Sequence, residues 1–304
     1  MTRSADNSLM RWATRAAVSV ALTLVIAKAY AWWLSSSVAV LGSLADSALD
    51  LAASLVTLMA VKAAVSPADQ DHRFGHGKAE ALAGLFQAAV MAGSAVFLVL
   101  EAVKNIWQPH ALAASTLVMG VSTLAIVLSL FLVAFQAFVV RRTKSLAIAG
   151  DHLHYKGDLL LNLAVIAAAY TSSIGWIYAD GVFGLLIAFY ILYGSWGVAR
   201  PAVDMLMDKE LSDTDREAIF NMALGNVHVQ GLHELKTRAS GRDVFIQMHI
   251  EVDGELSVRD AHFVSDEVEA MIGEAYPDAE IIIHVDPPSE RSAELTYSEL
   301  RPED

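Results

Sequence analysis

The sequence predicts an all-α bundle of six transmembrane helices followed by a small α+β domain with the element order α-β-β-α-β. Of the 304 residues, 55% are hydrophobic and the mean hydropathy is +0.45, which is too apolar for an ordinary soluble protein. No Asp, Glu, Lys or Arg occurs between Asn105 and Arg141, and that run exceeds the roughly 20 residues that cross a bilayer. After Pro201 the apolar runs become short and amphipathic, which indicates a separate domain.

Six apolar runs of membrane-spanning length occupy the first two-thirds of the chain. They cover residues 10–34, 37–62, 80–107, 112–140, 145–172 and 178–202. Lys and Arg gather in the connections near 62–78 and 141–144, whereas the connections near 35, 109 and 174 contain neither. Because basic connections stay in the cytoplasm, we expect both termini on the cytoplasmic side.

The remaining elements form the predicted α+β domain. Helices are expected near 213–224 and 257–275, and strands near 232–239, 243–252 and 279–286. The predicted domains are a transmembrane domain over 1–208, a cytoplasmic metal-binding domain over 209–288, and a disordered acidic tail over 289–304.

Charge separates the two domains. Residues 1–209 hold 14 basic and 12 acidic side chains, a net charge near +2, whereas residues 210–304 hold 7 and 22, a net charge near −15. An acidic domain of this kind suits cations and argues against a nucleic-acid partner, which would need clustered Lys and Arg. There is no cysteine, so any metal must be held by His, Asp and Glu.

Two pairs of ionisable residues lie inside apolar runs at helical spacing. Asp46 and Asp50 are four residues apart in one run, and His154 and Asp158 repeat that spacing in another. Ionisable residues at membrane depth are costly and usually mark a transport site, and residues i and i+4 share one helix face. Three carboxylates and one imidazole suit a tetrahedral divalent metal.

The alternative is that these carboxylates are neutral or paired and only hold the bundle together. The sequence offers no Lys or Arg at similar depth except Lys156 on a different face, so the excess negative charge favours a cation. Asp151 shares the face of His154 and is expected as an outer-shell partner, whereas His152 points elsewhere.

A second group lies in the connection between the second and third runs. Asp69, His72 and His76 occur in the segment ADQDHRFGHGKAEA, where Gly75 and Gly77 would let the backbone fold around an ion. The alternative is an ordinary solvated loop with a tight turn.

A third group is spread over four elements of the C-terminal domain. Its members are His233, His249, His262, His284 and Asp286. Strand alternation puts His284 and Asp286 on one face. Histidines of a small domain are often merely structural or exposed, but this number with a same-face Asp favours a metal site.

The segments SLADSALD, HRFGHGKAEALA and DHLHYKGD, in this order, resemble the cation diffusion facilitator family over residues 10–288, and in particular its bacterial zinc and ferrous-iron efflux members. The resemblance implies a homodimer of six-span protomers in the bacterial inner membrane, with a metallochaperone-like cytoplasmic domain. It also implies exchange of cytoplasmic Zn²⁺ for external protons by alternating access.

The resemblance assigns a role to each group of residues. It implies that Asp46, Asp50, His154 and Asp158 form the transport site, and that Asp69, His72 and His76 form a loop site. The five C-terminal residues would form a two-metal site at the dimer interface, with a structural or regulatory role for Zn²⁺.

The ligand chemistry agrees with this expectation. Zn²⁺ needs deprotonated carboxylates and a neutral imidazole, so metal and protons compete for the same atoms. We expect His154 to be a principal proton carrier, because an imidazole titrates near neutral pH. A histidine ligand favours Zn²⁺ and Cd²⁺ over Mg²⁺ and Ca²⁺, while Fe²⁺, Co²⁺ and Mn²⁺ stay open.

Two other functional classes remain as alternatives. A metal-gated channel or sensor would conduct without proton counterflow, and the sequence does not separate it from an antiporter. An intramembrane metallohydrolase would need a motif such as H-E-x-x-H and a general base, which this chain lacks, so no enzyme activity is expected.

Overall fold

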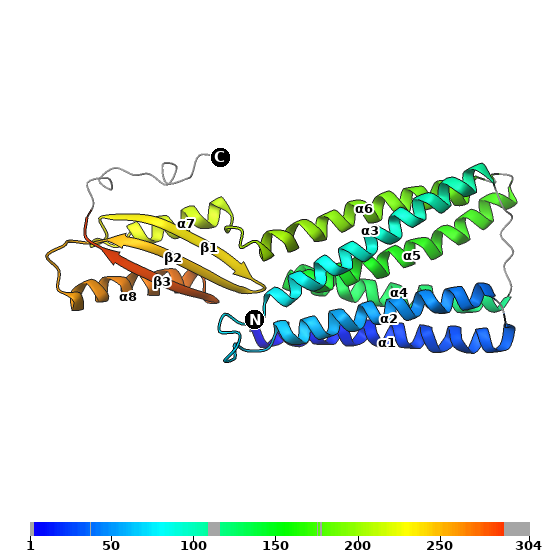
Figure 1. Ribbon diagram of the computed structural model, residues 1–304, viewed down its shortest axis with the longest axis horizontal. Helices are drawn as coiled ribbons and strands as arrows, with labels where there is room; N and C mark the ends of the chain where they lie inside the picture. Colours follow the sequence, from blue (N-terminus) through cyan, green and yellow to red (C-terminus); the bar gives the residue numbers. More distant parts are fainter. Residues whose placement is uncertain (1–2, 37, 109–115, 175, 177, 289–304) are drawn as a thin grey trace. The chain divides into compact units, whose positions relative to one another are not determined.

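The structure is a computed structural model that describes residues 3–36, 38–108, 116–174, 176 and 178–288. The connection expected near 109 and the predicted acidic tail lie outside the described residues. Six long helices come first (Figure 1): α1 (Arg3–Ser35), α2 (Val38–Ala64), α3 (Lys78–Trp107), α4 (Thr116–Thr143), α5 (Leu146–Ser173) and α6 (Ala179–Leu206). The chain divides into two compact units between Val203 and Asp204.

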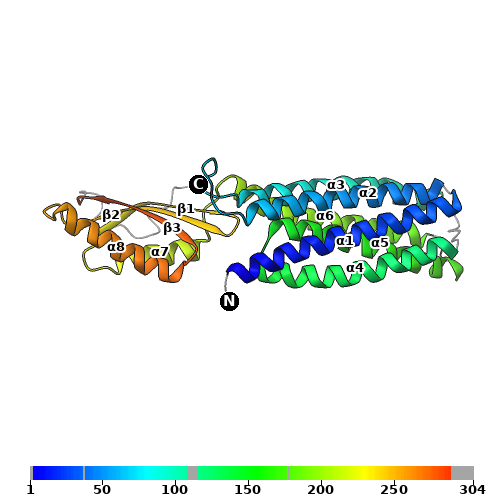
Figure 2. The ribbon, with the colours of Figure 1, turned by 90° about the horizontal axis from the view of Figure 1, so that it is seen from below.

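Five of the described helices, α1, α2, α3, α4 and α6, are long and apolar enough to cross a membrane. Helix α5 is as long as α4, at 28 residues, but carries Asp151, Lys156 and Asp158. It packs against α2, α3 and α4, so it belongs to the same bundle (Figure 2). The polar residues that weaken its hydropathy are therefore those of the predicted transport site and its surroundings.

Small residues set the spacing of the helices. A Cβ atom on Gly150 of α5 would lie 2.7 Å from the Cβ of Gln87 on α3, and one on Gly181 of α6 would lie 2.7 Å from the backbone oxygen of Ala102 on α3. Glycine at such contacts lets helix backbones approach closely in a membrane.

Helix α1 begins at Arg3, well before the start expected near residue 10. The extra turns are tied to α4, because the Arg142 Nε donates to Asp6 Oδ1 at 2.6 Å. Hydropathy cannot detect a polar helical extension of this kind, which explains the late predicted start.

The second unit contains α7 (Asp213–Leu224), β1 (Gly231–Ser240), β2 (Asp243–Glu251), α8 (Val258–Ala275) and β3 (Ala279–Asp286). The sheet order is β1-β2-β3, with β1 antiparallel and β3 parallel to the central β2. Ser212 and Ser257 cap α7 and α8 by accepting backbone N–H bonds from Asp215 and Asp260.

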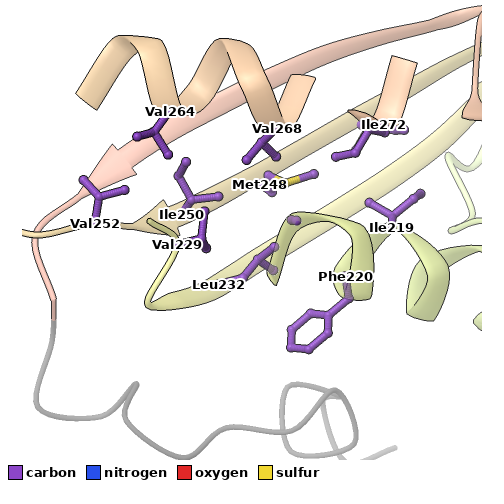
Figure 3. Packing of buried hydrophobic residues seen from close by; sticks show 12 residues of the cluster. Ile219, Phe220, Val229, Leu232, Met248, Ile250, Val252, Val264, Val268 and Ile272 are labelled. Atoms are coloured by element: carbon purple, nitrogen blue, oxygen red, sulfur yellow. The ribbon is translucent and has the colours of Figure 1, made fainter. Parts of the chain in front are cut away.

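The core of this unit lies between the two helices and one face of the sheet (Figure 3). Ile246, Met248 and Ile250 alternate along β2 and are all buried. On α8, Val264, Val268 and Ile272 are spaced four residues apart and pack on the same core. Because strand side chains alternate, His249 must point to the opposite face of the sheet.

Candidate metal centres

The first centre lies between α2 and α5 in the membrane unit. The Nε2 of His154 on α5 lies 2.9 Å from Asp50 Oδ1 on α2 and 3.5 Å from Asp158 Oδ2, one turn further along α5. The side chain of His154 is 9% exposed, and those of Asp50 and Asp158 are 24% and 35% exposed. One imidazole and two carboxylates therefore offer ligand atoms within 4.8 Å of one another.

The fourth predicted ligand, Asp46, lies outside this group and is exposed on α2. It is one turn before Asp50, so it is on the same side of the helix. Its part in the transport site stays a prediction.

The expectation that no other cation lies at this depth except Lys156 is wrong. Lys28 on α1 donates from Nζ to Ser47 Oγ at 2.6 Å and to the Ser43 carbonyl at 3.1 Å, both on α2. Ser47 is next to Asp46, so a positive charge lies beside the carboxylate-bearing helix. A single Lys within an apolar run could have indicated this charge, but Lys28 belongs to no recognisable motif.

Polar residues surround the first centre. Asp151 accepts hydrogen bonds from Ser54 Oγ at 3.1 Å and Gln136 Nε2 at 2.6 Å, and Ser54 also bonds to the Tyr155 hydroxyl. Ser54 and Gln136 thus supply the hydrogen bonds of the Asp151 carboxylate, which lies one turn before His154 and is not bonded to it. The other ring nitrogen of His154, Nδ1, lies 3.0 Å from the Met91 sulfur on α3, a contact that no sequence pattern indicated.

The second centre is the loop between α2 and α3. Asp69 lies 3.3 Å from a ring nitrogen of His72 and 3.3 Å from one of His76. The backbone N–H of His72 donates to Asp69 and lowers the pKa of that carboxyl, with further help from the Asp71 N–H and the two histidines. Gly75 has a φ of 77°, which a glycine adopts without strain. The residues are largely exposed apart from His76, whose side chain is 19% exposed.

The third centre lies on the face of the sheet opposite the core. The strand register places His233 beside His249, and His249 beside His284. Asp286 approaches all three histidines, at 3.4 Å from His233, 2.9 Å from His249 and 3.2 Å from His284. The hydrogen bond from His249 is the main cause that lowers the pKa of Asp286.

Two residues modify this picture of the third centre. Glu251 is 1% exposed at the side chain, and its Oε1 lies 3.4 Å from His233 Nδ1, although the sequence did not single it out. His262 lies on α8, is 73% exposed, and contacts Asp266 at 3.6 Å. Within one chain it does not join His233, His249 and Asp286, so its role as a ligand stays a prediction.

Comparison with known proteins identifies the family. Residues 14–207 match the family described as the cation efflux transmembrane domain, and residues 211–288 match the cation efflux protein cytoplasmic domain. The chain belongs to the cation diffusion facilitator family of cation efflux proteins. The resemblance and the two-part fold predicted from the sequence are therefore confirmed.

Relatives of this cation efflux protein match along nearly their whole length. The cation-efflux pump FieF of Salmonella choleraesuis is 41% identical over 279 residues, which cover 92% of this chain and 93% of FieF. FieF of Salmonella arizonae is 40% identical over 292 residues, which cover 96% and 97%. A solved structure, the metal-bound C-terminal domain of the CzcD transporter from Thermotoga maritima, is 32% identical with a TM-score of 0.24 and covers 25% of this chain and 94% of that one.

Proposed function

We propose that this cation efflux protein exports Zn²⁺ in exchange for protons. In this proposal the side chains of Asp50, His154 and Asp158 bind both the metal and the protons. The observation that carries the proposal is the convergence of these side chains from α2 and α5 on one point inside the bundle. Ionisable groups inside a membrane domain are costly unless they serve an ion pathway. The absence of a nucleotide-binding motif leaves an ion gradient as the driving force.

Exchange follows from competition for the same atoms. Zn²⁺ binds neutral imidazole and ionised carboxylates, so binding expels protons and protonation expels the metal. His154 Nε2 lies 2.9 Å from Asp50 Oδ1, so a proton on Nε2 would be shared with Asp50, and the lone pair left by that proton is the one a metal would take. The same nitrogen therefore serves as the proton carrier and as the metal ligand.

The donor set favours Zn²⁺ among biological divalent cations. One nitrogen and two carboxylate oxygens suit Zn²⁺, whereas Mg²⁺ and Ca²⁺ prefer oxygen ligands alone. Asp46 would complete a tetrahedral set if the exposed carboxylate moved toward Asp50, one turn away. Cd²⁺ and Fe²⁺ are alternative cargoes for the same donors.

The remaining assignments concern placement and regulation. The basic connections favour a topology with both termini in the cytoplasm of a bacterial cell and the spans in the inner membrane. The protein acts as a homodimer, and the cytoplasmic family domain at residues 211–288 supports this assembly. His233, His249, His284 and Asp286 fit a resident Zn²⁺ that neutralises part of the acidic domain, with His262 as a further ligand in the two-tail assembly.

Proton release on metal binding tests the exchange directly. Zn²⁺ is titrated calorimetrically in buffers of different ionisation enthalpy, using full-length protein that carries Asp69→Asn and Asp286→Asn to weaken the loop and tail sites. We expect proton release that His154→Gln removes, while the matched variant His228→Gln, outside every group, retains it. An unchanged proton count in His154→Gln would overturn the assignment.

A further inference from the structure

A cavity of about 340 Å³ opens between α4 and α5, on the side of α5 away from the transport carboxylates. Its wall combines apolar side chains of α4, such as Leu130, Val133 and Ala137, with the basic side chains Arg141, His152 and Lys156. No acidic residue is among those that line it. A cavity in a membrane helix pair that is apolar along one wall and cationic along the other suits an amphiphile with a negative head.

The basic residues lack anionic partners in the part of the chain that the structure describes. Neither Arg141 nor Lys156 forms an ion pair there, and the Lys156 ammonium instead lies 5.1 Å from the centre of the Tyr190 ring on α6. The His152 ring hydrogen-bonds the Val133 backbone, while its buried Nδ1 atom has no hydrogen-bond partner among the described residues. Buried polar atoms are nearly always satisfied, so this nitrogen indicates a missing polar partner, while the negative charge of that partner follows from Arg141 and Lys156.

The three basic residues lie at the end of the bundle where α4 and α5 connect, between the hydrocarbon boundary and about 9 Å inside it. Helix α4 has 28 residues, so it is about 42 Å long and exceeds the roughly 30 Å hydrocarbon core by about 12 Å. If the excess is shared between its ends, the hydrocarbon boundary lies about four residues inside α4 and α5, close to Val140 and Gly150. Arg141 then lies at the boundary, His152 lies about 3 Å below it and Lys156 about 9 Å below it, with the Lys156 ammonium against the Tyr190 ring.

We propose that this cavity binds one anionic phospholipid of the leaflet at the α4–α5 connection, with its phosphate between Arg141, His152 and Lys156 and an acyl chain along Leu130, Val133 and Ala137. Basic pockets between transmembrane helices recognise such headgroups by charge. The lipid neutralises Lys156, which is otherwise a cation within the hydrocarbon layer. The site is separate from the metal centres and does not depend on transport.

Native mass spectrometry of the full-length protein in detergent tests the site. The protein is incubated with dioleoyl phosphatidylglycerol or with dioleoyl phosphatidylcholine, and retained lipid is counted. We expect one phosphatidylglycerol to be retained in preference to phosphatidylcholine. Its dissociation constant should rise about fivefold in Lys156→Gln or Arg141→Gln and about 25-fold in the double variant.

Matched variants and competitors separate the alternatives. Lys62→Gln removes an exposed cation at the end of α2, outside the cavity, and should leave retention unchanged. Arg141 is exposed, so Arg141→Gln tests the site without risk to folding. The proposal would be overturned by equal retention of both lipids, or by unchanged retention in Arg141→Gln and the double variant. Displacement of the lipid by equimolar inorganic phosphate would also overturn it, because it would indicate a simple anion site.

Discussion

Asp286 is the one carboxylate that approaches all three clustered histidines of the C-terminal domain, so its replacement tests the third metal centre most sharply. At a free Zn²⁺ concentration 100 times the dissociation constant, binding to the folded state alone stabilises it by about 2.7 kcal/mol. The compact unit that begins at Asp204 has its own core. For a domain of roughly 100 residues, each kcal/mol raises Tm by about 4–8 °C. Zn²⁺ should therefore raise its Tm by about 11–22 °C.

Asp286→Asn keeps the size of the side chain and removes the charge shared by the three rings. Loss of one ligand should weaken Zn²⁺ binding by about 100-fold or more, the upper end of the loss seen for outer-shell partners. At the same Zn²⁺ concentration the stabilisation then falls to about 0.4 kcal/mol, or about 2–3 °C.

Thermal unfolding of the domain from Asp204 onward, followed by circular dichroism with Zn²⁺ and with a chelator, measures both shifts. His262→Gln is the matched control, because His262 is exposed on α8 and should leave the shift in place in the single domain. An Asp286→Asn domain that keeps the full shift would refute the ligand set derived from the strand register.

Three further predictions concern other parts of the chain. Lys28→Met removes a cation beside the carboxylate-bearing helix and should tighten Zn²⁺ binding by about fivefold, equivalent to a charge interaction of about 1 kcal/mol, as measured by competition with a chromophoric chelator; weaker binding would contradict this. Gly150→Ala would place a methyl group 2.7 Å from the Gln87 Cβ and should destabilise the bundle by about 1–3 kcal/mol in detergent melts, whereas Gly197→Ala, with nothing within 4 Å, should be close to neutral. The native pKa of Asp286 is lowered, so its ionised carboxylate stabilises the fold, and this contribution is present above the unfolded-state pKa of about 4. The free energy of unfolding of the metal-free C-terminal domain should therefore fall as the pH drops from about 4 through the native pKa of Asp286. Asp286→Asn should reduce this loss of stability at acidic pH.

The i, i+4 spacing predicted which helix faces carry the residues of the first centre. The cost of charge in a membrane was the reason to group Asp50 with His154 and Asp158, and the structure brings these three together. Asp46 has the same spacing but is exposed outside the group, because spacing gives the face of a helix and not the distance across to its neighbour.

Residues without periodic partners could not be predicted. Lys28 and Met91 reach their neighbours only through the packing of α1 and α3, which no local pattern encodes. Glu251 shares the His249 face of β2, but strand alternation does not show the pairing with β1 that brings it to His233. His262 has the residue type of a ligand, yet it occupies a helix on the core side of the sheet.

Zn²⁺ flux into proteoliposomes under an imposed pH gradient, compared between the wild-type protein and Asp50→Ala, tests the central claim most directly. Metal/proton exchange through the first centre predicts flux that the gradient drives and that Asp50→Ala abolishes. Flux that ignores the gradient would indicate a metal-conducting channel, and gradient-driven flux that persists in Asp50→Ala would contradict the location of the transport site.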